Sequence, residues 1–363
     1  MTELIQTPEA LAPHLARWAS RSWLTVDTEF VRIDTYYPKL CLIQIGDGDA
    51  SVCLDILALK DTGPLLDVLY APSSIKVFHA VAQDLEILVR LRGSCPQPLF
   101  DTQIAATLLG VGDQIGYAGL IEKRLGVVLD KSLSRTDWAR RPLTEPELAY
   151  AAADVSHLAT VFLALQDELA TGGRLSWLAE DCARLARPEL YVTQPEDAWE
   201  RLRGLARMSA AEQTVAARLA AWRETEAQKR DRPRKWIIDD DVIYRLAERQ
   251  PNGLAQLEAL NVLPPKTLER HGETLVALVA EARTLPPLKL AADEELTADQ
   301  KARLRELQTA VQARATELKL PPGYLAPRAD LVELLRRGAS AKVPLLSGWR
   351  LEVCGEAMLK QFF

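Results

Sequence analysis

The sequence predicts an α/β domain with a mixed sheet, followed by an all-helical second half. Its 363 residues are enough for two or three domains of ordinary size. Up to Phe100, short runs with β-strand composition alternate with helical patterns, and three of these runs follow one another before the alternation starts. This order is typical of an α/β domain whose sheet contains parallel and antiparallel pairs. Beyond Phe100 the pattern is almost wholly helical.

The first half has clear local signals for its elements. A helix is expected to begin near Pro8, because Thr7 is a good N-cap and proline is tolerated in the first turn. A second helix is expected from about Val81 to Leu91. Gly46–Asp49 has the composition of a hairpin turn. Strands are expected at Trp23–Val26, Leu40–Ile45, Ser51–Asp55 and Ile75–Phe78.

The second half has the signals of several helices. Met208–Lys229 is rich in Ala, Glu, Gln and Arg, which favours one long helix. Asp239–Asp241 can cap the helix that follows. Arg283–Pro287 indicates a linker, and a further helix is expected from about Thr297 to Leu318.

A weak internal repeat links the helical segments. Pro233–Trp236 precedes an amphipathic pattern that recurs after Pro321–Tyr324 at the same offsets, 88 residues later. The interpretation is one small helical unit present twice. The alternative is chance, because two amphipathic helices can always be aligned somewhere.

Composition excludes several classes of protein. The chain is 48% hydrophobic and 26% charged, and it has no run of about 18 apolar residues, so a membrane span is not expected. The first residues lack the pattern of a secretion signal, so we expect a cytoplasmic protein. The five cysteines are scattered without a C-x-x-C pair, which disfavours a disulfide framework and a zinc site.

The charge distribution bears on possible partners. A net charge of −6 counts mildly against a nucleic-acid binder. However, residues 223–235 contain six Lys or Arg and three Asp or Glu, and such a local positive patch can still collect phosphate groups.

Acidic residues at three separate places form the candidate functional site. Asp27 and Glu29 follow a strand-like run, and residues two apart on a strand point to the same side. Two carboxylates on one face of a buried strand repel each other unless a cation lies between them. The alternative is a strand end at which both acids are solvated.

The other two places are Asp84 and the pair Tyr150 and Asp154. Asp84 lies near the start of the second predicted helix, where an acid also suits the helix dipole. Tyr150 and Asp154 are four residues apart on a helical segment and share a face. The alternative for this pair is a core tyrosine beside a surface aspartate. His79 is interpreted as a packing residue, and Asp101 as an N-cap.

Clustered carboxylates suit one chemistry in particular. Hydrolysis of a phosphodiester is assisted by divalent cations on the attacking and leaving oxygens, and carboxylates hold such hard cations. Together the acidic stretches resemble the three motifs of the DEDD superfamily of 3′→5′ exonucleases, in the subgroup whose third motif carries tyrosine. The stretches are Val26–Phe30 with Leu42–Ile45, Val77–Glu86, and Ser134–Leu143 with Tyr150–Asp154.

The resemblance extends to the ribonuclease D family and covers nearly the whole chain. The helical half resembles two consecutive HRDC domains, with Ala326–Leu331 and Ser347–Arg350 as the most similar stretches of the second. The resemblance implies a ribonuclease H-like mixed sheet followed by two all-α HRDC-like domains. The implied boundaries are 1–190, 195–285 and 292–363.

The resemblance also implies a role for each candidate residue. Asp27 would bridge two Mg²⁺ ions, for which Mn²⁺ can substitute. Glu29 and Asp154 would complete the site that activates water, and Asp84 would hold the second ion through water. Tyr150 would orient the attacking water, because an ordinary tyrosine pKa of about 10 makes it a poor base near neutral pH.

The function implied is a 3′→5′ exoribonuclease that releases 5′-mononucleotides. The sequence leaves the oligomeric state open, and a monomer is favoured. Its substrates would be RNAs with an accessible 3′ end, with tRNA precursors as the usual class for such enzymes. The alternatives are a DNA exonuclease with the same chemistry and a non-catalytic RNA-binding adaptor. The helical half would grip RNA, and its candidate surface comprises Lys229, Arg230, Arg232, Arg234, Lys235 and Trp236. We therefore expect deletion of 195–363 mainly to weaken binding.

Overall fold

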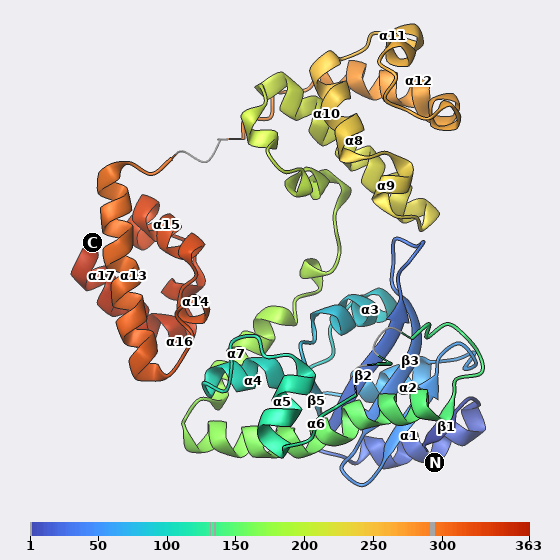
Figure 1. The fold of residues 1–363 in the computed structure, drawn as a ribbon, viewed down its shortest axis with the longest axis vertical. Coiled ribbons are helices and arrows are strands. Elements are labelled where there is room, and N and C mark those ends of the chain that lie inside the picture. The colour runs from blue at the N-terminus through green and yellow to red at the C-terminus, as the bar shows by residue number, and fades with distance from the viewer. Residues whose placement is uncertain (1, 131, 134–135, 291–294) are drawn as a thin grey trace. The chain divides into compact units, whose positions relative to one another are not determined.

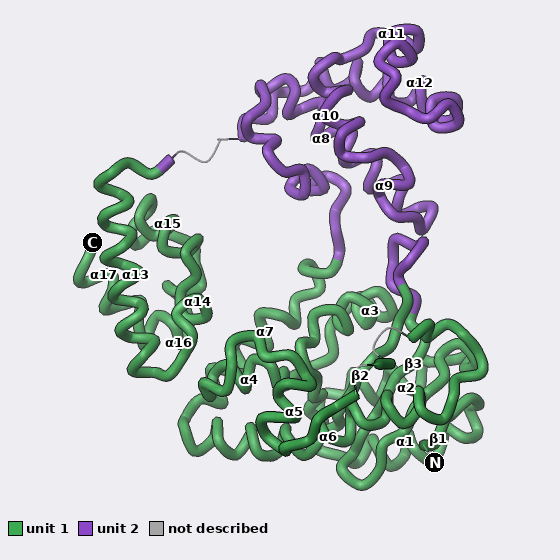
Figure 2. The backbone as a smooth tube through the Cα atoms, in the orientation of Figure 1, with its two compact units in different colours: residues 1–31, 40–191, 296–363 green, residues 32–39, 192–295 purple. Residues whose placement is uncertain are grey.

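The computed structural model describes residues 2–130, 132–133, 136–290 and 295–363. Ser134 and Arg135, which belong to the third acidic motif, lie outside the described residues. The chain forms two compact units, shown in Figure 2. Unit 1 comprises residues 1–31, 40–191 and 296–363, and unit 2 comprises residues 32–39 and 192–295.

Within the described residues of unit 1, six strands form one mixed sheet in the order β1-β4-β3-β2-β5-β6. Figure 1 labels β1, β2, β3 and β5 of this sheet. β1 is parallel to β4, and β5 is parallel to β2 and to β6, whereas β3 and β4 are antiparallel. All four predicted strands are confirmed. The strands are β1 (Glu3–Ile5), β2 (Trp23–Val31), β3 (Lys39–Gly46), β4 (Ser51–Asp55), β5 (Ile75–Phe78) and β6 (Leu99–Asp101).

β2 is the strand that matters most for function, because it lies inside the sheet between β3 and β5. It continues to Val31, beyond the predicted end at Val26, so Asp27 and Glu29 are part of the strand. Gly46–Asp49 forms the predicted turn after β3, in which the Asp47 carboxylate accepts from the amides of Asp49 and Ala50.

Helices cover the sheet, and local signals mark their ends. Thr7 caps α1 through its side chain, which accepts from the Ala10 amide, as predicted. Asp101 caps α4 by accepting from the amides of Gln103 and Ile104. The helices of this part are α1 (Pro8–Ala19), α2 (Gly63–Leu69), α3 (Ala82–Arg92), α4 (Thr102–Leu108), α5 (Tyr117–Leu125), α6 (Glu145–Thr171) and α7 (Leu175–Leu185).

α6 is the long core helix of unit 1. Thr144 and Glu147 form a capping box at its start, and Val161, Phe162 and Leu165 are fully buried in the shared core. It packs against β2, β4 and β5. Among the described helices, α6 alone is long and apolar enough to cross a membrane, but half of its most apolar stretch is buried inside the protein. The burial is that of a core helix.

The C-terminal helices of unit 1 dock onto α7 and share its hydrophobic core. Trp349 stacks on Trp177 with ring centroids 4.5 Å apart. The buried Asp181 carboxylate accepts from Arg350 at 2.5 Å and from the Tyr324 hydroxyl at 2.5 Å. The helices are α13 (Ala298–Leu318), α14 (Pro322–Leu325), α15 (Arg328–Arg337), α16 (Gly348–Arg350) and α17 (Glu356–Phe362), with 3-10 turns at Gly338–Ser340 and Pro344–Leu346 and a π-helical turn at Leu351–Gly355.

Because of this docking, deletion of 195–363 is not a clean test of RNA binding. Removing 195–363 would expose the Trp177 face of α7 and take Arg350 and Tyr324 away from Asp181, so the deletion would damage unit 1 as well as any RNA contact. Point substitutions are therefore the better test of RNA binding.

We expect Arg350→Met to destabilise unit 1 by roughly 3–5 kcal/mol, because it leaves the buried Asp181 carboxylate with only Arg184, 3.9 Å away, as a cationic partner. Chemical denaturation measures the effect. Arg337→Met is the control, since Arg337 pairs with Glu333 on the surface and should matter little. Equal stability of the two variants would contradict this account of the docking.

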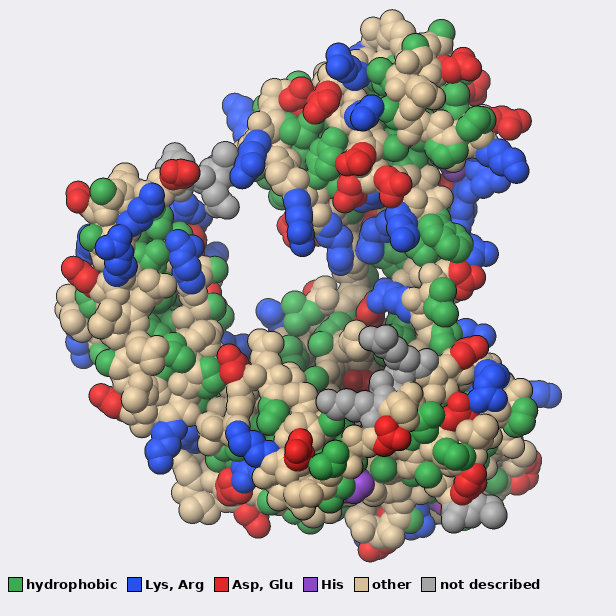
Figure 3. Space-filling model, in the orientation of Figure 1, with side chains coloured by type: hydrophobic (Ala, Val, Ile, Leu, Met, Phe, Trp, Pro, Cys, Tyr) green, Lys and Arg blue, Asp and Glu red, His purple; other side chains and the backbone are tan. Residues whose placement is uncertain are grey.

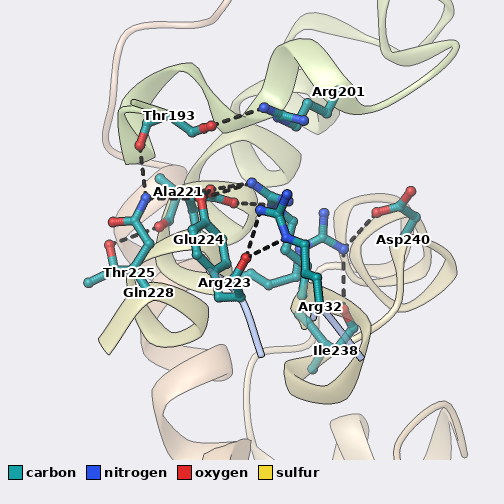
Figure 4. Close-up of polar contacts among 12 residues, drawn as sticks. Arg32, Thr193, Arg201, Ala221, Arg223, Glu224, Thr225, Gln228, Ile238 and Asp240 are labelled. Atoms are coloured by element: carbon teal, nitrogen blue, oxygen red, sulfur yellow. Dashed lines mark hydrogen bonds and ion pairs between the residues drawn. The ribbon is translucent and has the colours of Figure 1, made fainter. Parts of the chain in front are cut away.

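Unit 2 is built around α8. Figure 4 shows the buried Arg223 donating to Asp240 and to the Ile238 carbonyl, while Gln228 donates to the Thr193 carbonyl. The Tyr36 hydroxyl and Arg234 both donate to the buried Glu224. The helices are α8 (Ala210–Arg230), α9 (Arg234–Ile237), α10 (Asp240–Arg249), α11 (Leu254–Ala259) and α12 (Pro265–Ala282), and 3-10 turns lie at Pro195–Arg201 and Leu205–Arg207, with another at Pro188–Leu190 in unit 1.

The internal repeat has a structural counterpart. α8 and α13 begin at Ala210 and Ala298, 88 positions apart, and both have a capping box. Both end at a left-handed residue, Asp231 and Lys319, which are again 88 positions apart. The helix pairs α9 and α14, and α10 and α15, keep the same offset. The repeated order supports one helical unit present twice.

Candidate active site

Asp27, Glu29 and Asp154 come together although Asp154 lies more than 120 positions from the other two. Asp27 and Glu29 project from the same side of β2, and Asp154 projects from α6, which packs against β2. One carboxylate oxygen of each residue lies within 4.8 Å of the others, and all three side chains are half-buried. This spacing lets three carboxylates contact a common cation.

Asp84 lies beside this group rather than within the three-residue cluster. It is buried in the first turn of α3, and its carboxylate accepts a hydrogen bond from the Thr28 hydroxyl at 2.5 Å. Its charge is close enough to act on Glu29, and the charge of Asp27 acts on Asp84. Thr28 was not singled out from the sequence, because a threonine between two acids gives no signal of its own.

The raised pKa values of the four acids show that their charged forms are unfavourable without a nearby cation. Burial, together with the neighbouring carboxylates Asp27, Asp154 and Asp84, raises the pKa of Glu29 to about 9. Burial and then Asp27 raise the pKa of Asp154 to about 8, and burial raises the pKa of Asp27 to about 6. Burial and Asp27 also raise the pKa of Asp84 well above its usual value. These residues fit hard divalent cations, which supply the missing positive charge and prefer carboxylate oxygen.

Tyr150 lies near the carboxylates on the α6 side, because the charges of Asp154, Glu29 and Asp27 act on it. It lies one helical turn before Asp154, and its half-buried ring stacks on Trp138 at 6.4 Å between centroids. Burial, and then the charges of Asp154, Glu29 and Asp27, raise its pKa. The hydroxyl therefore stays protonated near neutral pH and can orient a water molecule, but it is not a general base.

His79 has structural contacts, in keeping with its predicted packing role. Its two ring nitrogens lie 3.0 Å from the Thr102 hydroxyl and 3.0 Å from the Ile115 carbonyl oxygen.

The segment before α6 is tied to the sheet by Arg141, which lies within the third acidic motif. Arg141 donates to both carboxylate oxygens of Asp55 at the end of β4, at 2.6 and 2.8 Å, and to the Cys41 carbonyl. Arg140 donates to Glu147 in the capping box of α6. These contacts hold the start of the helix that carries Tyr150 and Asp154.

Comparison with protein families gives the class of this protein. Residues 2–170 match the family model described as 3'-5' exonuclease, and residues 212–279 match the HRDC domain model. The fold and the family match define a 3′→5′ exonuclease of the metal-dependent DEDD class, followed by a helical HRDC region.

Individual relatives narrow the class to one family. The chain is 37% identical to a ribonuclease D of Pseudomonas paraeruginosa over 98% of its length and 96% of the relative's. It is 39% identical to a ribonuclease D of Granulibacter bethesdensis, over 98% and 91% of the two chains. The crystal structure of Escherichia coli ribonuclease D matches 100% of this chain and 99% of that one, with a TM-score of 0.90 and 34% identity. The chain belongs to the ribonuclease D family.

The family gives the activity: the protein is a 3′→5′ exoribonuclease, and RNA is its substrate. The predicted fold class and family are thereby confirmed. Of the alternatives, the DNA exonuclease and the non-catalytic adaptor are not supported.

Proposed function

We propose that Asp27, Glu29, Asp84 and Asp154 hold two Mg²⁺ ions, and that Tyr150 orients the attacking water. When bound, the ions supply Lewis acidity and lower the pKa of coordinated water. Asp27 lies centrally, since its charge acts on Glu29, Asp84 and Asp154, and it would contact both ions. Glu29 and Asp154 would complete one ion site. Asp84, held by Thr28, would serve the other. The carboxylate cluster is the observation that supports this assignment.

The test uses RNA labelled at its 3′ end. The protein should release labelled mononucleotides at once in Mg²⁺ or Mn²⁺, and none in EDTA. RNA blocked by a 3′-phosphate should be shortened more slowly. Labelled 3′ fragments longer than one nucleotide as the first products would overturn the proposed direction and mechanism.

We further propose that the physiological substrates are structured RNAs, with tRNA precursors as the leading class. The Escherichia coli relative is described as an exoribonuclease involved in structured RNA processing, and it aligns with the whole of this chain. Conversion of a tRNA precursor to a defined 3′ end, faster than degradation of an unstructured RNA of equal length, is the expected result.

The basic segment of unit 2 divides into inward and outward residues. Arg234 is committed to Glu224, at 2.5 Å, and Arg230 pairs with Glu226. Trp236 is 55% exposed, so it is not a core tryptophan, and Arg232 lies over its ring at 5.7 Å. Lys229 and Lys235 are exposed nearby. Lys and Arg side chains lie on the face of unit 2 seen in Figure 3. We propose that the exposed Trp236 ring stacks on an RNA base, and that Lys229, Arg232 and Lys235 neutralise RNA phosphates.

Trp236→Ala should weaken RNA binding by about 1–3 kcal/mol, the loss of one stacked base. Fluorescence anisotropy with labelled RNA measures it. Phe363→Ala is the matched control, because Phe363 is 51% exposed and also carries an arginine, Arg303, at 5.7 Å from its ring. If both variants bind RNA like the unaltered protein, the stacking role of Trp236 is wrong.

The raised pKa values predict how pH affects the metal site. Without metal, protons occupy Glu29 and Asp154 up to their pKa values of about 9 and 8. A group whose pKa is raised on folding adds stability below its unfolded pKa and loses it as pH rises through the folded one. The metal-free protein should therefore lose thermal stability between about pH 5 and pH 9, and Mg²⁺ should bind more tightly across the same range as these protons leave.

Thermal unfolding with and without Mg²⁺ measures this coupling. The increase in Tm caused by Mg²⁺ should grow from pH 6 to pH 9. Glu29→Gln, whose side chain carries no titrating proton, should lose the part of that growth due to Glu29 and keep the part due to Asp154. A pH-independent Mg²⁺ effect in the unaltered protein would contradict the assignment.

Location, oligomeric state and domain division stay proposals. We propose a cytoplasmic monomer whose domains are residues 1–190, 195–285 and 292–363. Light scattering coupled to size exclusion tests the monomer, cell fractionation tests the location, and limited proteolysis tests the boundaries.

A further inference from the structure

The turn of α6 that carries Asp154 receives hydrogen bonds from outside the helix. The Thr25 hydroxyl donates to the Val155 carbonyl at 2.9 Å. The Tyr117 hydroxyl donates to the Asp154 carbonyl, and it lies 3.3 Å from the Ala153 carbonyl. Two side chains from different elements therefore grip three successive carbonyls around one acidic residue.

These bonds are not needed to satisfy the helix. Residues 153–155 lie in the interior of α6, where carbonyls already accept from amides four residues later. Carbonyls that lack an amide donor within the helix occur only in its last turn. The additional donors therefore tie this turn to β2 through Thr25 and to α5 through Tyr117.

Thr25 links this turn directly to the strand that carries Asp27. Thr25 and Asp27 are two positions apart on β2, so their side chains face the same side of the strand. Thr25 is fully buried, and its hydroxyl also lies 3.2 Å from the Gly46 carbonyl. A Cβ at Gly46 would lie 2.4 Å from the Thr25 hydroxyl oxygen and 3.2 Å from the Val155 carbonyl oxygen. The close approach of β2, β3 and α6 at this point thus requires glycine at position 46.

Tyr117 is itself held in place, so it can act as a fixed support. It begins α5, and its ring packs edge-on against His79 with centroids 5.6 Å apart. The contacts of His79 with Thr102 and with the Ile115 carbonyl anchor that ring to α4 and to the segment before α5.

We propose that Thr25 and Tyr117 are positioning residues of the nuclease site. They hold the Asp154 turn against β2, so that the carboxylates of Asp27 and Asp154 stay within the span that one cation bridges. The inference rests on the proposed metal-binding role of these acids. The competing explanation is that both hydroxyls only stabilise the fold.

The experiment compares metal dependence with stability in the full-length protein. The variants are Thr25→Val and Tyr117→Phe, which remove a hydroxyl and little else, and Thr25→Ser, which keeps the donor. Two matched controls remove similar bonds away from the acids. Thr107 is buried and bridges two carbonyls, those of Gln103 and Gly112, and the Tyr191 hydroxyl donates to the Leu185 carbonyl at 2.9 Å. The controls are therefore Thr107→Val and Tyr191→Phe.

Initial rates on a 3′-labelled RNA are measured across Mg²⁺ concentrations, and Tm is measured alongside. Thr25→Val and Tyr117→Phe should raise the half-saturating Mg²⁺ concentration by roughly 10–100-fold, the usual effect of losing a residue that orients a metal ligand. kcat at fixed Mg²⁺ should fall while KM for RNA stays within about threefold. Thr25→Ser should restore most of the metal affinity, and the controls should lower Tm without moving the Mg²⁺ midpoint.

The inference is wrong if Thr25→Val and Tyr117→Phe shift the Mg²⁺ midpoint no further than the controls at a similar loss of Tm. If Thr25→Val does not fold, Tyr117→Phe decides the question alone. Asp27→Asn in the same assay distinguishes failure of the positioning inference from failure of the metal site. Loss of activity there with unshifted midpoints in the hydroxyl variants overturns only this inference, whereas full activity of Asp27→Asn overturns the metal site itself.

Discussion

Asp27→Asn is expected to lower RNA hydrolysis by at least about 10³-fold while the protein remains folded. Asn has the size of Asp but lacks the charge that a bridging ligand needs. Asp27 is the acid whose charge acts on Glu29, Asp84 and Asp154, so no other single change removes as much of the site's attraction for cations. Asp154→Asn should have a similar effect, because it removes the contribution of α6.

The same substitution should not weaken the metal-free protein. Like charges in the cluster raise the pKa of Glu29, so removing one of them relieves repulsion. Tm in EDTA should therefore be unchanged or higher, while the Mg²⁺-induced increase in Tm disappears. Asp67→Asn, at an exposed aspartate paired with Arg92, is the control and should keep full activity. Near-normal rates for Asp27→Asn in Mg²⁺ would refute the assignment.

Tyr150→Phe should lower kcat by roughly 10²–10⁴-fold, the range for a positioned group that handles protons in the reaction. Phe keeps the stacking on Trp138, so folding and RNA binding should be preserved. The half-saturating Mg²⁺ concentration should also stay constant, because Tyr150 is not assigned as a ligand. This pattern separates Tyr150 from the carboxylates, whose loss should change metal binding.

Single-turnover kinetics with saturating enzyme isolates the chemical step of Tyr150→Phe. Tyr70→Phe removes a hydroxyl of unit 1 that donates to the Leu88 carbonyl and lies 3.2 Å from the Ser94 carbonyl, and it serves as the control. A fall of less than about tenfold for Tyr150→Phe would mean that the hydroxyl does not orient the nucleophile.

Periodic local patterns explain why much of the site could be predicted from the sequence. The two-residue spacing of Asp27 and Glu29 places both acids on one side of β2, and the four-residue spacing of Tyr150 and Asp154 places both on one face of α6. Caps such as Thr7 and Asp101 act within three residues, so the sequence alone identifies them. The three-residue strands β1 and β6 are too short to show a period, and they were missed.

Features that depend on tertiary contact could not be predicted in this way. No local pattern distinguishes Thr25, Thr28 or Tyr117 from other hydroxyl residues, because their partners lie 21 to 130 positions away. The side-chain directions in the basic segment could not be predicted from the sequence either. Arg234 and Lys235 are neighbours in sequence, yet only Arg234 is committed to the buried Glu224. The direction of each side chain follows from packing around α8, which composition does not reveal.

The most direct test of the central claim is to locate the metal ions. Crystals of the protein with Mn²⁺ and an RNA whose scissile phosphate resists hydrolysis would show Mn²⁺ by anomalous scattering. The account predicts two peaks, both within coordination distance (about 2.1 Å) of Asp27 oxygens, with Glu29 and Asp154 around one and Asp84 near the other. Mn²⁺ bound elsewhere, with no peak beside Asp27 while the RNA 3′ end occupies the site, would contradict it.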